Sequence, residues 1–232
     1  MRKDSKKKTI YHGSAGIIET PTFGKGNVNN DYGLGFYCTY DPELAKEWAV
    51  GKGRDGYANR YSISEEELSI LNLGDGNYNI LNWLSVLVDN RIFKVKSEVA
   101  MDARNYLLGN FLPDYHKYDV IRGYRADDSY FAFANDFLNN VITLEKLNYA
   151  MSLGNLGEQY VLMSQRAFDN LSFEGWELAS NEIYFPRKEK RDWEARESYF
   201  KYRTLSTEGH YMIDILREKW RNDDERIQRI IY

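Results

Sequence analysis

The stretch Tyr11-His12-Gly13-Ser14 stands near the start of the chain, and the stretch Tyr32-Gly33-Leu34-Gly35-Phe36-Tyr37 follows about two dozen residues later. Residues 8–12 read as a short strand that ends at the glycine of the first stretch. Residues 35–39 read as a second short strand, which takes in the end of the second stretch. Residues 15–31, rich in Gly, Asn, Thr and Pro, predict an irregular loop between them. The two motifs therefore mark a strand, a loop and a second strand.

The composition is typical of a folded globular protein. The 232 residues include 43% hydrophobic and 28% charged residues, with 19 Tyr, 11 Phe and 5 Trp to supply buried area. This length allows one large domain or one domain with an appendage. The formal net charge of -4 excludes a global basic field for nucleic acid, although a local basic patch stays open. The basic residues 1–8 are typical of a solvated terminal tail.

The single cysteine, Cys38, excludes an internal disulfide and a cysteine-based zinc site within one chain. Its place among aromatic neighbours favours a small buried hydrophobic role. The three histidines, His12, His116 and His210, are too scattered along the chain to predict a metal cluster. No apolar stretch reaches the length of a membrane span, and no apolar signal segment follows the basic start. We therefore expect a cytoplasmic protein without a metal site or a membrane segment.

Apolar spacing and cap residues predict most of the remaining elements. Asp41-Pro42-Glu43 predicts a helix start, with Asp41 as N-cap and Pro42 at the first helical position. Residues 57–73 mix strand and turn signals. Further helices are expected at residues 79–90, 97–112, 129–139 and 143–151, and strands at residues 118–121 and 159–163.

The composition changes after Phe185-Pro186. Residues 187–203 are dominated by Arg, Lys and Glu, and residues 208–221 place apolar side chains at helical spacing. We interpret residues 187–232 as a charged helical C-terminal appendage, peripheral to the site, on a domain of residues 1–186. The charged run is either a solvated helix face or a contact surface for a partner or a nucleic acid.

The residue types in the two opening motifs suit the binding of an amide and of an aromatic ring. A glycine such as Gly13 lets backbone N–H and C=O groups approach a carboxamide closely, because it has no Cβ. Gly33 and Gly35 leave room beside a strand on which Tyr37 can present a flat ring. Each motif also has a plain structural interpretation, namely a strand-ending turn with a hydrogen-bonded His12 and a core tyrosine.

Together the two motifs resemble the NAD-binding half of the ADP-ribosyltransferases of the diphtheria-toxin and poly-ADP-ribose polymerase class. The resemblance implies that NAD is the substrate, that His12 hydrogen-bonds the adenosine ribose, and that Gly13 and Ser14 hold the nicotinamide carboxamide. It also implies that Tyr37, on the strand that begins at Gly35, stacks on the nicotinamide ring. Cleavage of the nicotinamide–ribose bond passes through an oxocarbenium-like state, as in glycoside cleavage. The implied fold is α+β, with two small antiparallel sheets split around an NAD cleft and helices around them.

The resemblance also implies a catalytic glutamate on a late strand, and here the sequence departs from the pattern. In Gly157-Glu158-Gln159-Tyr160-Val161-Leu162, aligning the tyrosine puts Gln159 where the class has glutamate, and we expect its side chain to face the cleft. Successive strand side chains point to opposite faces, so Glu158 and Gln159 cannot both face NAD without a bulge or a turn. Asp127 and Asp128, after an earlier strand, are a second source of carboxylate or else the N-cap of the next helix. Glu158, Gln159 and Asp128 are thus the candidate catalytic residues.

Most of the chain, about residues 9–200, also resembles a bacterial family known as domain of unknown function 3990. The shared segments are Tyr11-His12-Gly13-Ser14, Asp31-Tyr32-Gly33-Leu34-Gly35-Phe36-Tyr37, Asn82-Trp83-Leu84, Tyr118-Asp119-Val120-Ile121, Ala126-Asp127-Asp128-Ser129-Tyr130 and Gly157-Glu158-Gln159. That family is grouped with the ADP-ribosyltransferase fold, and its members often look like parts of bacterial toxin–antitoxin or phage-defence loci. The resemblance implies this context for the chain.

The expected function is NAD-dependent mono-ADP-ribosyl transfer to a macromolecule, either a protein or a nucleic acid, with an antitoxin protein as a candidate partner. Two alternatives stay open. One is an NAD glycohydrolase that uses water as the acceptor at the same site. The other is a catalytically degenerate binding module, of which Gln159 would be the signature.

Overall fold

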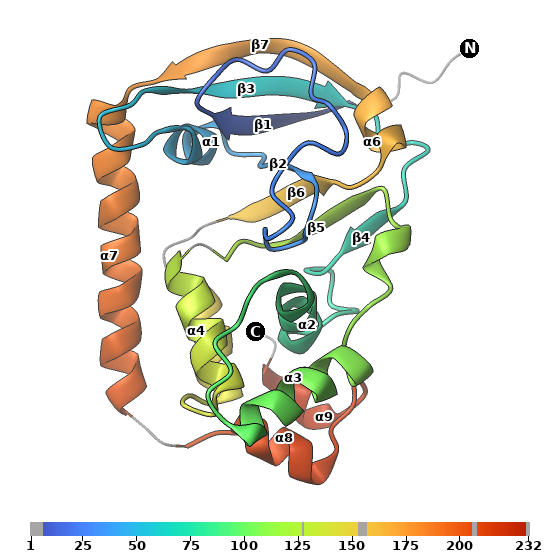
Figure 1. Cartoon of the computed structure of the whole chain (residues 1–232), viewed down its shortest axis with the longest axis vertical. Coiled ribbons are helices and arrows are strands. Elements are labelled where there is room, and N and C mark those ends of the chain that lie inside the picture. The colour runs from blue at the N-terminus through green and yellow to red at the C-terminus, as the bar shows by residue number, and fades with distance from the viewer. Residues whose placement is uncertain (1–6, 127, 153–156, 206–207, 231–232) are drawn as a thin grey trace.

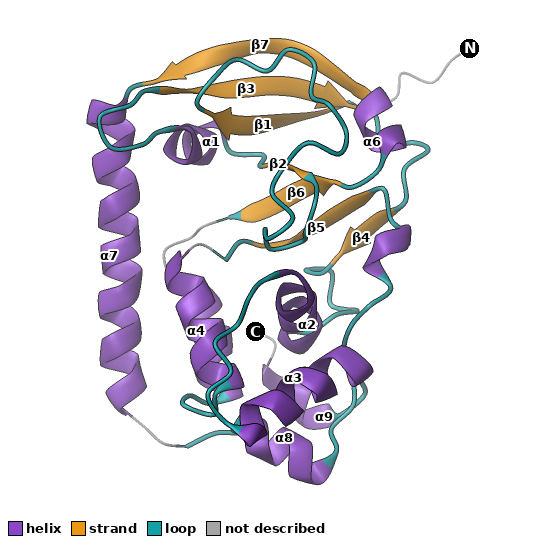
Figure 2. Cartoon of the chain, viewed as in Figure 1, coloured by secondary structure: helices purple, strands orange, loops and turns teal. Residues whose placement is uncertain are grey.

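The computed structural model describes residues 7–126, 128–152, 157–205 and 208–230. They form two sheets with helices packed around them (Figures 1 and 2), which confirms the expected α+β class. The strands are β1 (Lys8–Ser14), β2 (Phe36–Cys38), β3 (Gly56–Ile63), β4 (Ile70–Asn72), β5 (Val120–Tyr124), β6 (Glu158–Leu162) and β7 (Leu171–Ala179). The helices are α1 (Pro42–Ala49), α2 (Ile80–Asn90), α3 (Glu98–Asn110), α4 (Asp128–Leu138), α5 (Leu144–Ser152), α6 (Gln165–Asp169), α7 (Asn181–Leu205), α8 (Met212–Glu218) and α9 (Glu225–Ile230), with a short 3-10 helix at Tyr115–Lys117.

The two sheets differ in their strand directions. One has the order β1-β3-β7, and all its neighbours are antiparallel. The other has the order β2-β6-β5-β4, in which β4 and β5 run parallel while the other pairs are antiparallel. The expectation of antiparallel sheets is therefore wrong for the β4–β5 pair. The reason is the long connection through α2 and α3, which lets the chain return in the same direction.

The sheets meet where β1 passes the end of β2. Tyr11 and Thr39 exchange two backbone hydrogen bonds there, with N···O distances of 2.8 and 2.9 Å. In Figure 1 the β1-β3-β7 sheet lies above the second sheet. The loop at residues 15–31 leaves β1 and returns through residues 32–35 to β2, so this bridge brings the two ends of the connection together.

The apolar residues form two main cores. A smaller core lies between the sheets, and a larger one lies between the second sheet and the helices. The smaller core contains Ile10, Phe36, Cys38, Tyr61, Ile63, Val120, Tyr160, Leu162 and Ala167. Cys38 is a fully buried free thiol, and burial raises its pKa well above the ordinary value. The small hydrophobic role favoured by its neighbours agrees with this position.

Helix α1 begins where its sequence predicts. The side chain of Asp41 accepts hydrogen bonds from the backbone N–H groups of Glu43 at 2.8 Å and Leu44 at 3.4 Å. Pro42 occupies the first helical position, where its missing N–H costs nothing. The predicted N-cap is therefore confirmed.

Two glycines let α1 lie very close to the first sheet. A Cβ built on Gly13 would overlap the carbonyl oxygen of Ala45 and lie 2.9 Å from the backbone nitrogen of Ala49. A Cβ on Gly56 would overlap the carbonyl oxygen of Ala49. Because successive strand residues face opposite sides, α1 packs on the face of β1 that His12 does not use.

The C-terminal helices share the larger core. Helix α7 starts at Asn181 and contains Pro186 near its N-terminal end, so the division expected after residue 186 falls inside one helix. Ala195 and Tyr199 of α7 are buried in the larger core together with side chains of α8 and α9. Figure 1 shows α7 running along one side of the molecule, from the first sheet to the helices below. The described parts of α7, α8 and α9 thus contribute side chains to the larger core.

None of the helices in the described part of the chain combines the length and the apolar character that a membrane crossing requires.

Candidate functional site

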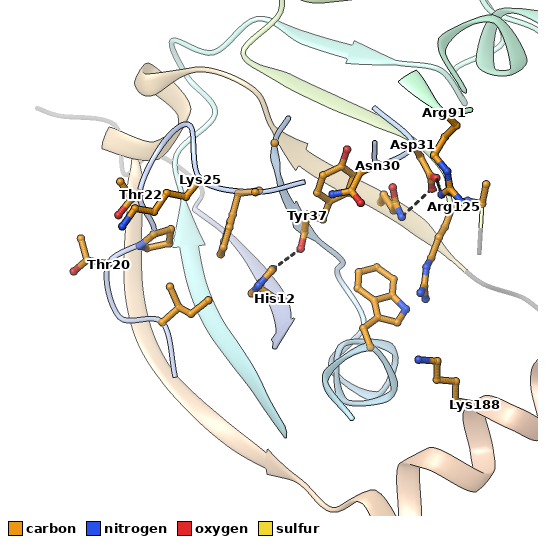
Figure 3. A pocket seen from close by; sticks show the side chains of 18 residues that line it. His12, Thr20, Thr22, Lys25, Asn30, Asp31, Tyr37, Arg91, Arg125 and Lys188 are labelled. Carbon is orange, nitrogen blue, oxygen red and sulfur yellow. Dashed lines mark hydrogen bonds and ion pairs between the residues drawn. The ribbon is translucent and has the colours of Figure 1, made fainter. Parts of the chain in front are cut away.

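A cavity of about 700 Å³ opens between the loop at residues 15–31 and the strands β1, β2 and β6 (Figure 3). Its volume is in the range of roughly 300–1,000 Å³ that is usual for small-molecule sites. Both sheets contribute to its wall, as do the helices α1 and α7. The wall side chains that matter below are His12, Lys25, Asp31, Tyr37, Trp48, Arg91, Arg125, Gln159 and Lys188.

His12 is held in one orientation at this wall. Its Nδ1 lies 2.7 Å from the carbonyl oxygen of Tyr37, and its ring stacks on Phe36 with the centroids 4.1 Å apart. A carbonyl oxygen only accepts hydrogen bonds, so Nδ1 carries the proton and Nε2 is the acceptor of the neutral ring. Burial lowers the pKa of His12, although the bond to the carbonyl opposes the shift. The ring is therefore neutral and offers an acceptor at neutral pH.

The hydroxyl of Tyr37 makes two hydrogen bonds that hold its side chain in place. It donates to the carbonyl oxygen of Gly33 at 2.6 Å and accepts from the backbone N–H of Tyr32 at 3.1 Å. Burial raises the pKa of Tyr37 far above its ordinary value, so the hydroxyl stays neutral. The flat ring is thus a rigid part of the wall.

Gly13 and Ser14 lie beside the cavity, outside the set of residues that line it. The backbone N–H and C=O of Tyr11 both bond to Thr39, on the edge of β1 that lies opposite β3. Because the direction of these groups alternates along a strand, the N–H and C=O of Gly13 point to the same edge as those of Tyr11. The hydroxyl of Ser14 donates to the carbonyl oxygen of Gly16 at 2.6 Å and accepts from Asn59 Nδ2 at 3.0 Å. Ser14 therefore holds the start of the loop.

Gly35 does line the cavity, and its lack of a side chain has a packing reason. A Cβ there would lie 2.6 Å from Cγ1 of Val161 and 2.9 Å from the sulfur of Met163. The glycine thus lets β2 approach β6 closely.

The late strand separates its two candidate residues. Gln159 lines the cavity with 5% of its surface exposed, which is the orientation expected from the sequence. Glu158 points elsewhere and pairs with Arg122, with 2.6 Å between Oε2 and Nη2. Asp127 lies outside the described residues. Asp128 is the first residue of α4, and its side chain also lies outside the description.

Asp31 is a cavity residue that the sequence did not single out. Only 4% of its surface is exposed, and its Oδ1 lies 2.8 Å from Nη1 of Arg91. Its Oδ2 accepts from the backbone N–H of Ala126 at 2.8 Å and from Nε2 of Gln159 at 3.4 Å. Burial raises the pKa of Asp31, while these donors and the nearby Arg125 oppose the shift. The signal in the sequence was its place as the first residue of the shared segment at residues 31–37, to which no role was assigned.

The charge of the wall is mainly positive. Among the described residues, Asp31 is the one carboxylate that lines the cavity, against the four cations Lys25, Arg91, Arg125 and Lys188 (Figure 3). The guanidinium of Arg125 lies over the Trp48 ring, 4.4 Å from its centroid. A cavity with this balance in an acidic chain favours anionic ligands. Within the described residues, no group of three or more His, Cys, Asp or Glu side chains could hold a metal ion.

Two buried polar atoms of the wall have no hydrogen-bond partner among the described residues. They are Oε1 of Gln159, an acceptor, and Nε1 of Trp48, a donor. Buried polar groups are nearly always paired, and an unpaired one costs about 1–3 kcal/mol. The pair therefore points to a ligand that both donates and accepts hydrogen bonds.

The family model described as "Protein of unknown function (DUF3990)" matches residues 8–173. The chain belongs to this family. The DUF3990 match contains every cavity side chain named above except Lys188, and it ends within β7. No curated protein and no solved structure gives a significant match to the chain.

In this DUF3990 protein, acidification should destabilise the fold through His12. Its pKa is lowered on folding, so the stabilisation is present above the unfolded-state pKa of about 6.5 and is lost as the pH falls through the folded value. Urea unfolding at about pH 7 and about pH 5.5 measures the loss for the wild type and for His12→Asn, which cannot titrate. We expect the wild type to lose more stability than the variant. Equal losses would contradict the assignment of a buried neutral ring.

Proposed function

We propose that the cavity binds NAD and that the protein transfers ADP-ribose from NAD to a macromolecule. The observation that carries the proposal is the meeting of His12, Tyr37 and Gln159, from three strands in two sheets, in one cavity. These are three of the residues for which the motif resemblance implies contacts to NAD, while Gly13 and Ser14 lie beside the cavity. The unpaired atoms of Gln159 and Trp48 also favour a ligand with hydroxyl or amide groups.

Each part of NAD has a chemically suitable group in the proposed complex. Nicotinamide would stack on Tyr37, with its carboxamide at the backbone edge of Gly13. Nε2 of His12 would accept from a hydroxyl of the adenosine ribose, and Oε1 of Gln159 from one of the nicotinamide ribose. The two phosphates would lie among the cations of the wall, which are Lys25, Arg91, Arg125 and Lys188.

The reaction breaks the bond between the nicotinamide nitrogen and the ribose, and the bonding electrons leave with nicotinamide. Positive charge then develops on the ribose, so a fixed negative charge nearby lowers the barrier. An acceptor on the macromolecule attacks the sugar carbon and loses its proton. The wall residues bind the dinucleotide, orient the ribose and exclude water.

One feature of the wall favours a second candidate, a binding module without turnover. The late-strand residue that faces the cavity is Gln159, while Glu158 is paired with Arg122 outside it. An amide supplies no negative charge of its own. An NAD glycohydrolase would use the same wall with water as the acceptor. A toxin or phage-defence role in bacteria, with an antitoxin as partner, remains a proposal from family resemblance.

The test is incubation of the protein with a cell lysate and NAD that carries its label in the adenosine half. Free nicotinamide and labelled protein and nucleic-acid fractions are measured separately. We expect nicotinamide release together with one labelled macromolecular fraction. Release of nicotinamide without a labelled macromolecule would show that the protein is an NAD glycohydrolase. Binding of NAD without release of nicotinamide would show that it is a binding module.

His12→Ala provides the matched variant for the binding part of the proposal. Loss of one acceptor and of the bond that holds the ring should weaken NAD about tenfold in a calorimetric titration, because such bonds contribute roughly 1–1.5 kcal/mol. His116→Ala is the control, since His116 is exposed and lies outside the cavity wall. Equal NAD affinity in wild type and His12→Ala would remove His12 from the site.

A further inference from the structure

The amide of Gln159 has a defined orientation in the cavity wall. Its Nε2 lies 3.4 Å from Oδ2 of Asp31, a long hydrogen bond, and its Oε1 is buried without a partner. An ionised carboxylate can only accept hydrogen bonds, so the amide nitrogen must face Asp31. The carbonyl oxygen of Gln159 is then left as a buried acceptor without a partner.

Asp31 is itself held rigidly. Arg91 and the N–H of Ala126 bind its two oxygens at 2.8 Å each, and the Arg91 guanidinium lies 4.5 Å from the centroid of the Phe131 ring. The backbone next to Asp31 is also fixed, because the hydroxyl of Tyr37 accepts from Tyr32 N–H. These contacts join the loop to the ends of α2 and β5.

The contacts of Asp31 favour its charged form. Arg91 and the Ala126 N–H donate to it directly, and Arg125 lies near enough to stabilise a negative charge. Burial acts in the opposite direction and raises its pKa. Within the described residues, this is the one negative charge that the cavity wall can supply.

We propose that Asp31 is the positioning residue of the site, which turns Oε1 of Gln159 toward the sugar hydroxyl next to nicotinamide and supplies the negative charge that the amide lacks. This inference rests on the proposed function, because the sugar belongs to NAD. Asp31 acts through Gln159 and forms no covalent bond. Two neighbouring side chains, one buried carboxylate and one amide, thus replace the single glutamate of the class that the motifs resemble.

A first experiment tests the contact without any substrate. In ¹⁵N-labelled protein, the side-chain NH₂ signal of Gln159 is assigned by its loss in Gln159→Met. We expect slower hydrogen exchange for this group than for exposed Gln165, and a shifted signal with faster exchange in Asp31→Asn. Asp114→Asn, at an exposed carboxylate outside the wall, should leave the signal unchanged. A Gln159 signal that is insensitive to Asp31→Asn would overturn the positioning role.

A second experiment measures the consequence for catalysis. Asp31→Asn should lower the rate of nicotinamide release at saturating NAD about tenfold or more, with a much smaller change in NAD affinity. Gln159→Met should lose a similar factor, and the double variant should be no slower than Gln159→Met alone, since the two residues act as one unit. Independent losses that multiply in the double variant would overturn the coupling. The NMR fingerprint verifies that each variant is folded, and Gln159→Met still tests the site if Asp31→Asn fails to fold.

Moving the carboxylate from position 31 to position 159 distinguishes this proposal from the alternative in which Gln159 alone is a weak substitute for the glutamate of the class. Gln159→Glu alone should give no gain in rate, because a second carboxylate beside Asp31 forces one of the two to take up a proton. The double variant Asp31→Asn with Gln159→Glu moves the single charge by one side chain and should recover at least the wild-type rate. A gain in Gln159→Glu alone would overturn the role of Asp31. If the wild type releases no nicotinamide, the proposed function fails and the catalytic part of the inference with it, while the NMR result still decides the contact.

Discussion

Gly13→Ala is expected to destabilise the folded protein by about 3 kcal/mol or more, which is the upper end of the usual cost of overpacking. The added methyl group would overlap the carbonyl oxygen of Ala45 and lie 2.9 Å from the backbone nitrogen of Ala49. Both are backbone atoms within helix α1, so no side-chain rotation can make room. The helix would have to move away from β1. The free energy of urea unfolding, followed by tryptophan fluorescence, measures the loss.

Gly16→Ala is the matched control for this change. Gly16 lies three residues further on, it is exposed, and a Cβ there would meet no atom within 4 Å. Its unfolding free energy should stay within about 0.5 kcal/mol of the wild type, as for most surface changes. An unfolding free energy of Gly13→Ala equal to that of the wild type would contradict the predicted clash with α1. A stable variant that binds NAD more weakly would favour the role of Gly13 that the resemblance implies, which is to hold the nicotinamide carboxamide.

Tyr37→Ala is expected to weaken the binding of NAD about a hundredfold, because stacking of a base on an aromatic ring contributes roughly 1–3 kcal/mol. The expected loss is at the upper end because the ring of Tyr37 is already fixed by Gly33 and Tyr32, so little ordering is needed on binding. Isothermal titration of NAD into both proteins measures the change, with thermal melting to verify that the variant is folded.

Two further variants separate the ring of Tyr37 from its hydroxyl. Tyr37→Phe keeps the ring and loses two hydrogen bonds to the loop, so we expect a loss of about fivefold to tenfold in NAD affinity. Phe200→Ala removes an exposed aromatic side chain of α7 outside the cavity wall, and its affinity should match the wild type. Equal affinities in Tyr37→Ala and wild type would reject stacking on this ring.

Local sequence signals located most of the elements. Asp41 and Pro42 mark the start of α1, and the apolar spacing of residues 79–90 predicts α2 (Ile80–Asn90). The edge strand β7 was not predicted, because its side chains are largely exposed and Gly175 stands at the irregularity opposite Arg60 and Tyr61. Leu171 and Phe173 pack against the smaller core, and the irregularity then interrupts the alternation of the strand. The start of α7 was placed too late, because a proline near the N-terminal end of a helix is tolerated.

The sequence by itself determined which strands carry His12, Tyr37 and Gln159, since short motifs and alternation are local properties of the chain. Only the tertiary structure decided what surrounds them. Asp31 meets Arg91, Ala126 and Gln159 across separations of 60, 95 and 128 residues. No periodicity encodes such contacts, because they depend on which strands pair and on where loops return. The same holds for Gly13, because only the folded chain places the backbone of α1 where a Cβ on this residue would lie.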